Sequence, residues 1–155
     1  MRDFDVRVGK GTTMTEPVAR GIFLSMPLHY FSAASDPVAV YLEESISLSE
    51  ERRGMDAIVG IGPTARIESS YDMPRLSLEA GVGVNLVSTR VIGNRQLGSN
   101  VLFSPTISAG IEVPWAGGYL GVFYMFRHLS NASMFEDNHG INFQYIVFSM
   151  RFASF

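Results

Sequence analysis

Apolar and polar residues alternate with a period of two along most of this chain. In residues 76–86, Leu-Ser-Leu-Glu-Ala-Gly-Val-Gly-Val-Asn-Leu, the apolar side chains all fall on one face of an extended strand. The other face receives only small or polar residues. The same alternation recurs in residues 38–48, 56–69 and 101–113. We therefore predict long β-strands, each with one apolar face and one small or polar face.

The alternating segments predict eight strands, and several of them run beyond ten residues. The predicted starts lie near Phe4, Val18, Val38, Ala57, Leu76, Val101, Tyr119 and Asn142. Strands of this length exceed the five or six residues typical of soluble sheets and suit a tilted crossing of a bilayer. Charged residues on the non-apolar faces then point into a polar interior. We expect one domain over residues 1–155, an eight-stranded antiparallel transmembrane β-barrel of outer-membrane type. A soluble, lipocalin-like barrel is the alternative.

The connections between the predicted strands fall into two kinds. Short turns are expected at 35–37, 71–74 and 114–118, whereas longer or more polar links are expected at 47–55, 88–100 and 131–140. Outer-membrane barrels have short turns on the periplasmic rim and longer loops on the extracellular rim. We expect this arrangement, with both termini on the periplasmic side. The last predicted strand is rich in aromatic residues, which suits a lipid-facing strand with an interfacial girdle.

Composition excludes several classes of function. Charged residues make up 17% of the 155 residues and the net charge is −3, so no basic surface suggests a nucleic-acid partner. Without cysteine, the chain has no disulfide, thiolate metal site or cysteine nucleophile. Its three histidines are too scattered to suggest a metal cluster. Residues 1–10 lack the apolar segment of a signal peptide, so the chain is either cytosolic or a form from which the export signal was removed. A location in the bacterial outer membrane, which the strand pattern favours, implies the second.

Three residues with catalytic chemistry share the apolar face near the C-terminus. His128 and Ser130 point the same way because residues i and i+2 of a strand share a face. If the hairpin is centred near Phe135, Asn142 lies almost directly opposite His128. A serine activated by a histidine, itself oriented by a third group, is the arrangement for cleaving an acyl ester. Asn131 could stabilise the oxyanion through its backbone N–H or side chain. Alternatively, these residues are ordinary polar groups at a strand end.

The segments Arg-His-Leu-Ser-Asn-Ala-Ser (127–133) and Asn-His-Gly-Ile-Asn (138–142), with 78–84, 97–103 and 108–113 before them, resemble the PagL-type lipid A 3-O-deacylases. The resemblance covers residues 76–155 and implies an eight-stranded outer-membrane esterase. It implies Ser130 as nucleophile, His128 as general base and Asn131 in the oxyanion hole. The implied reaction is hydrolysis of the acyl ester at position 3 of lipid A, the lipid of lipopolysaccharide, without a metal or other cofactor. The sequence leaves open whether the barrel forms a homodimer.

Two positions depart from this family pattern. Asn142 stands where the family has a glutamate as third triad member, and Pro105 stands where it has an acidic residue. Asparagine can hold an imidazole by a hydrogen bond but cannot stabilise the imidazolium by charge. Glu136 or Asp137 could substitute for the missing acid. These departures keep a second interpretation open, a non-catalytic outer-membrane barrel, structural or lipid-binding, with a degraded triad.

Four further residues lie near the predicted loop rim. Arg90, Arg95 and Arg127 are either phosphate partners of lipid A or ordinary rim charges. His139 is expected to be a solvated loop residue.

Overall fold

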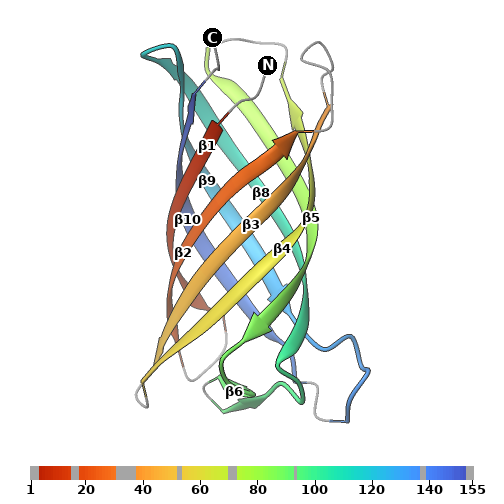
Figure 1. Cartoon of the computed structure of the whole chain (residues 1–155). Coiled ribbons are helices and arrows are strands. Elements are labelled where there is room, and N and C mark those ends of the chain that lie inside the picture. The colour runs from red at the N-terminus through yellow and green to blue at the C-terminus, as the bar shows by residue number, and fades with distance from the viewer. Residues whose placement is uncertain are drawn as a thin grey trace.

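Eight long strands close into an antiparallel barrel in the order β1-β10-β9-β8-β5-β4-β3-β2 (Figure 1). The computed structural model describes residues 4–14, 18–30, 38–51, 54–69, 73–92, 94–136 and 139–152. The barrel strands are β1 (Phe4–Thr13), β2 (Arg20–Tyr30), β3 (Val38–Glu51), β4 (Gly54–Glu68), β5 (Arg75–Val87), β8 (Val101–Trp115), β9 (Gly118–Leu129) and β10 (Ile141–Phe152). The predicted fold class is confirmed, and the predicted starts differ from the observed ones by three residues at most.

The apolar face of each strand points outward. Leu78, Val84 and Leu86 of β5 are 50%, 46% and 61% exposed, whereas the alternate residues Ser77, Glu79 and Asn85 are buried in the barrel. The same holds for the apolar sets of β4 and β8. Water disfavours such a surface, and a lipid bilayer accommodates it. In the described ranges, no helix is long and apolar enough to cross a membrane.

The barrel has two unlike rims. At one rim β1 begins, β10 ends and a two-residue link joins β8 to β9, since Phe4, Phe152 and Gly118 are successive partners. We call this the turn rim. At the other, which we call the loop rim, lie the 88–100 and 130–140 segments (Figure 1). One predicted loop is wrong: β3 continues to Glu51 and β4 starts at Gly54, so most of 47–55 is strand. The backbone of these residues pairs between β3 and β4, so the charged side chains do not end the strands.

The interior also changes along the barrel axis. Its turn-rim half holds buried ionic residues, including Arg7, Arg66, Arg151, Asp5, Glu79 and Glu112. Its loop-rim half holds an apolar core, which includes Ile58, Val87, Ile92, Leu97, Leu102, Leu129, Ile141 and Phe143. The buried ion pairs of the predicted polar interior are therefore concentrated in the turn-rim half, while the loop-rim half combines its apolar core with buried polar residues such as Arg127, Asn85 and Ser47. Period-two alternation does not distinguish the halves, because it reports which face a residue is on and not its depth.

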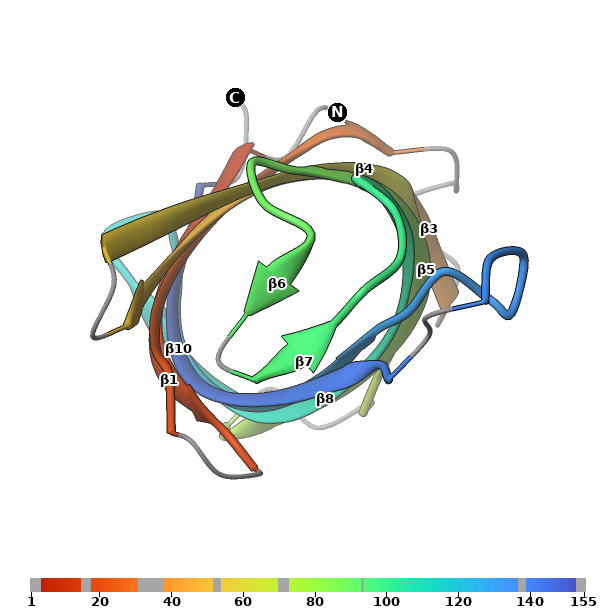
Figure 2. The same ribbon diagram turned by 90° about the horizontal axis from the view of Figure 1, so that it is seen from below.

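A small hairpin fills the barrel mouth at the loop rim. Its strands β6 (Val91–Ile92) and β7 (Arg95–Gln96) lie across the opening when the barrel is viewed along its axis (Figure 2). Ile92 and Leu97 are fully buried beneath it. Their burial gives the 88–100 segment a fixed position, because exposing two large apolar side chains costs about 3–6 kcal/mol. The segment is thus a packed plug.

Candidate active site

The β9–β10 hairpin brings the predicted catalytic residues together on its outward face. His128 and Asn142 are direct partners in the β9–β10 register, as predicted from the hairpin centre. His128 Nδ1 and Asn142 Oδ1 lie 2.6 Å apart, a short hydrogen bond. Both residues are half-buried. The flanking outward residues Val122 and Tyr124 of β9 are exposed and apolar or aromatic, so the pair borders the lipid-facing surface.

This hydrogen bond fixes the protonation pattern of the imidazole. The amide oxygen of Asn142 can only accept, so Nδ1 of His128 carries the proton and donates it. In the neutral ring Nε2 is then unprotonated and can accept a proton. This is the tautomer that a general base needs. Asn142 therefore provides orientation, whereas a carboxylate there would add charge stabilisation of the imidazolium.

Ser130 lies one step beyond His128 on the same face, where β9 ends. Its backbone exchanges two hydrogen bonds with Phe103 of β8: Phe103 N donates to Ser130 O at 2.7 Å, and Ser130 N donates to Phe103 O at 3.0 Å. The main chain of Ser130 is therefore fixed by the barrel. Among the residues that the structure describes, no hydrogen bond joins Ser130 Oγ to His128. Contacts between nucleophile and base are often loose without substrate and tighten when it binds.

The chain reverses directly after the serine in a left-handed turn. Ala132 and Ser133 have φ of 54° and 61°, and Met134 N donates to Asn131 O at 3.1 Å. Two successive positive φ values closed by this bond define a type I′ turn, which normally takes asparagine and glycine. Asn131 is fully buried, and its Nδ2 donates to Leu97 O of the plug at 3.0 Å. The plug thus holds the turn in place, and the turn carries local strain.

Gly140 lies against the imidazole from the other side of the loop. It has φ of 51°, and a Cβ built on it would lie 2.8 Å from His128 Cε1 and 3.2 Å from Nε2. Any larger residue would displace the ring or the strand. Sequence analysis did not single out this glycine. Its position directly before β10 is the signal that could have found it, because a glycine at a strand boundary marks a turn.

Pro105 lies next to His128 on the opposite side from Asn142. Thr106 pairs with Arg127 and Phe103 bridges to Ser130, and the same register places Pro105 opposite His128. Pro105 is exposed on the outward face of β8. Both departures from the family pattern therefore flank the same imidazole, one on each neighbouring strand.

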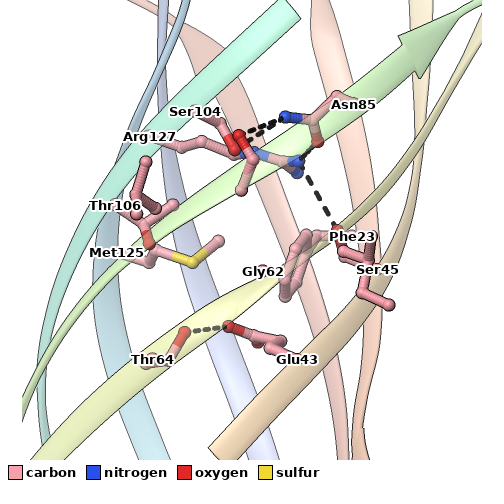
Figure 3. A pocket seen from close by; sticks show the side chains of 13 residues that line it. Phe23, Glu43, Ser45, Gly62, Thr64, Asn85, Ser104, Thr106, Met125 and Arg127 are labelled. Carbon is pink, nitrogen blue, oxygen red and sulfur yellow. Dashed lines mark hydrogen bonds between the residues drawn. The ribbon is translucent and has the colours of Figure 1, made fainter.

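Arg127 lies two residues before the loop-rim end of β9, as expected, but it is neither a rim charge nor an outward phosphate partner. Its side chain points into the lumen and is 3% exposed, because residue 127 alternates with the outward-facing His128. The guanidinium donates to Ser47 Oγ at 3.0 Å. It also donates to Asn85 Oδ1 and, at 3.5 Å, to Ser45 Oγ (Figure 3). It borders a cavity of about 20 Å³, large enough for about one water molecule. Arg127 therefore has a structural role inside the barrel.

The other rim residues belong to the loops. Arg90 Nε donates to Asn100 Oδ1 at 2.8 Å, and Arg95 donates to the His139 carbonyl at 3.2 Å. His139 is exposed, as predicted. Glu136 is also exposed, while Asn142 occupies Nδ1 of His128. The alternative acid Asp137 lies outside the described residues. Within the described ranges, no group of three or more acidic, histidine or cysteine side chains could hold a metal ion.

Comparison with known protein families identifies the family of this chain. The family model of lipid A 3-O-deacylase (PagL) matches residues 20–151, which include β2 to β10 and the whole candidate site. The chain belongs to the PagL family. Its members are ester hydrolases of the bacterial outer membrane that act on lipid A, and the outward-facing, apolar barrel surface agrees with that location.

Two solved structures share the PagL-type barrel. The crystal structure of the outer membrane enzyme PagL has a TM-score of 0.76 and 24% identity, and the match covers 94% of this chain and 98% of that one. The crystal structure of Neisserial surface protein A (NspA) has a TM-score of 0.69 and 9% identity, covering 97% and 96%. At these identities the two structures establish the fold alone. A comparison with curated protein sequences gives no match.

Proposed function

We propose that this protein is a serine esterase that hydrolyses the 3-O-linked acyl chain of lipid A, using Ser130 and His128. The observation that carries the proposal is the His128–Asn142 hydrogen bond, 2.6 Å long, on the outward face beside Ser130. Polar groups on a lipid-facing surface are costly unless they serve a ligand there. A lipid ester in the outer leaflet is the ligand that explains their direction, if the loop rim is extracellular.

The reaction follows from the roles of these groups. Nε2 of His128 accepts the Ser130 hydroxyl proton while Oγ attacks the ester carbonyl carbon. The resulting oxyanion receives a hydrogen bond from the backbone N–H of Asn131, the residue after the nucleophile, because the side-chain Nδ2 of Asn131 already donates to Leu97 O. When the intermediate collapses, the bond from the carbonyl carbon to the sugar oxygen breaks and His128 gives its proton to that oxygen. Water then attacks the acyl-serine by the same route, releasing a fatty acid and free Ser130.

Asn142 and Pro105 favour a second function, a lipid-binding barrel without catalysis. Asn142 stabilises the imidazolium less than a carboxylate would, and Pro105 adds no polar group on the other side of the ring. In this alternative the outward polar groups hold a lipid that they do not cleave. The two functions predict the same fold and the same location, so only a chemical assay separates them.

Mass spectrometry of lipid A incubated with the refolded protein in detergent tests the proposal, with Ser130→Ala as the matched control. Loss of one ester-linked acyl chain that disappears in the Ser130→Ala sample would support the esterase. Loss of the chain in both samples would remove Ser130 from the mechanism. Intact lipid A in both samples, with the barrel folded by circular dichroism, would favour the lipid-binding alternative.

A further inference from the structure

Two basic residues break the apolar outward surface close to the candidate site. Lys10 of β1 and Arg20 of β2 are exposed, and their neighbours on the same faces, Val8 and Ile22, are 50% and 56% exposed apolar residues. Among the described lysines and arginines, the other outward or exposed ones belong to the 88–100 loop, and the remaining arginines point into the lumen. Lys10 and Arg20 are therefore the described cations on the outward strand surface.

A continuous polar row connects these cations to the catalytic pair. Gln144 is the next outward residue of β10 after Asn142, Thr12 is its direct partner on β1, and Arg20 is the partner of Thr12 on β2. Tyr124 Oη donates to Gln144 Oε1 at 2.9 Å. The row therefore runs from β9 to β2 across the outward face, and Arg20, the first residue of its strand, is at the loop rim.

The cations line a groove in this surface. A cavity of about 390 Å³ is bordered by Lys10, Thr12, Arg20, Tyr124, Gln144 and Ile146. Within the described residues, neither Lys10 nor Arg20 takes part in an ion pair, and this holds also for Arg20 and Glu50, its register partner on β3. In a bilayer, exposed cations without a protein anion are stabilised by lipid phosphate.

We propose that Lys10 and Arg20 form a phosphate-binding site for the head group of the lipid substrate. This inference rests on the proposed function, because it requires that the ester at Ser130 and the phosphate belong to one lipid. The groove receives a sugar-linked phosphate, while the polar row from Thr12 to Asn142 faces the sugar between the two sites. The acyl ester then reaches His128 and Ser130 at the far end of the row. The site fixes which end of the head group approaches the serine.

Native mass spectrometry of the Ser130→Ala protein in neutral detergent tests this site without any hydrolysis. The probes are lipid A with both phosphates and lipid A from which the phosphates have been removed. Adding Lys10→Gln and Arg20→Gln is expected to weaken binding of the phosphorylated lipid about tenfold, because two charge-assisted contacts are lost. Binding of the dephosphorylated lipid should not change. Equal weakening for both lipids, or none for either, would overturn the proposal.

Two controls separate a specific site from general charge effects. Arg90→Gln removes a cation of the loop rim that is already bonded to Asn100, and it is expected to leave lipid A binding unchanged. Lys10→Arg should retain binding because it keeps the charge. A loss with Arg90→Gln equal to that with Lys10→Gln would overturn the site. Competition by phosphatidylglycerol as effective as by lipid A would overturn its assignment to the substrate.

The hydrolysis assay distinguishes failure of this site from failure of the proposed function. If the unmodified protein cleaves lipid A, the Lys10→Gln, Arg20→Gln variant should have a raised KM for the phosphorylated substrate only. If the unmodified protein does not cleave lipid A but phosphate-dependent binding persists, the esterase proposal falls and the phosphate site stands. If the unmodified protein cleaves lipid A but binding is independent of phosphate, the phosphate site falls and the esterase proposal stands.

Discussion

The turn-rim half of the lumen and the outward patch around His128 both remove polar groups from bulk water, but they satisfy those groups differently. In the lumen, Arg66 is fully buried and its guanidinium donates to Glu79 at 2.6 Å and to Asp5 at 3.1 Å. Arg7 bonds the same two carboxylates at 2.8 and 3.0 Å. On the outward patch, His128 has one fixed partner, Asn142, and its Nε2 has no hydrogen bond to a described residue.

The difference indicates which polar groups support the fold and which serve a ligand. Each charge in the cluster of Asp5, Arg7, Arg66 and Glu79 has an opposite charge from another strand beside it, so the ion pairs link β1, β4 and β5. Removing either partner of such a buried ion pair destabilises the protein, because the other charge is left buried without a partner. The outward patch has unused donors and acceptors in a low-dielectric surface. Mutations in the two regions should therefore separate stability from activity.

Replacing His128 with glutamine should give the largest effect, and on activity alone. Glutamine can still bond Asn142 but cannot accept the serine proton, so lipid A hydrolysis should fall about 10³-fold or more. The urea midpoint of unfolding in detergent should stay within error of the parent, since His128 is half-buried at the surface. Initial rates by mass spectrometry and unfolding by tryptophan fluorescence check both parts. A large fall in stability would make His128 part of the fold and weaken the comparison.

Glu79→Gln should have the opposite profile. Two arginines, Arg7 and Arg66, would lose their shared carboxylate in a buried site, which typically costs about 3–5 kcal/mol of unfolding free energy. The expected result is a lower urea midpoint, with the hydrolysis rate per folded molecule unchanged. Glu50→Gln, on the exposed outer face, is the matched control and should leave the midpoint unchanged. Equal stability of Glu79→Gln and parent would mean that water or rearranged partners replace the carboxylate.

Asn142→Glu should raise the hydrolysis rate about tenfold or more. The carboxylate would accept the same Nδ1 hydrogen bond and add an opposite charge beside the imidazolium that forms in the transition state. Asn142→Leu, which keeps the volume and removes the acceptor, should lower the rate below that of the parent because Nδ1 loses its orienting partner. A parent that is faster than Asn142→Glu would show that this pocket is adapted to the amide.

The sequence predicted the barrel architecture and the pairing of His128 with Asn142, but not the features that depend on depth in the barrel. Alternation fixes which face a residue occupies, so the outward position of His128 and Ser130 and the pairing of His128 with Asn142 followed from spacing. It cannot report neighbours four or more strands away. The packing of Leu97 beneath the mouth, its carbonyl bond to Asn131 and the bonds of Arg127 to Ser47 and Asn85 therefore required the three-dimensional structure. The Lys10–Arg20 groove depends on strands β1 and β10 meeting to close the barrel, which local pattern does not encode.

Gly140→Ala should lower activity about tenfold through the imidazole. The new methyl group would meet His128 Cε1 at 2.8 Å, and alanine at φ of 51° adds roughly 1–2 kcal/mol of backbone strain. Displacing the ring lengthens its approach to Ser130 and should reduce the rate more than the stability alone explains. Gly54→Ala, at a positive φ with open space around it, controls for strain without a ring contact. A similar loss of activity in both variants would assign the effect to folding.

Ser133→Gly should give the smallest effect and the opposite sign. Ser133 occupies a left-handed position of the type I′ turn, with φ of 61°, where glycine is the preferred residue. Removing the Cβ should stabilise the protein by about 0.5–1 kcal/mol, because the gain in the folded turn exceeds the added freedom of the unfolded chain. The hydrolysis rate should stay unchanged if the turn only holds Asn131 beside the nucleophile. In that case the hydrogen bond from Asn131 Nδ2 to Leu97 O still holds Asn131 in this variant. A stabilised protein with a slower rate would instead show that the strained turn sets the oxyanion geometry. Residues 132 and 133 would then belong with the residues that serve the ligand and not with those that only support the fold.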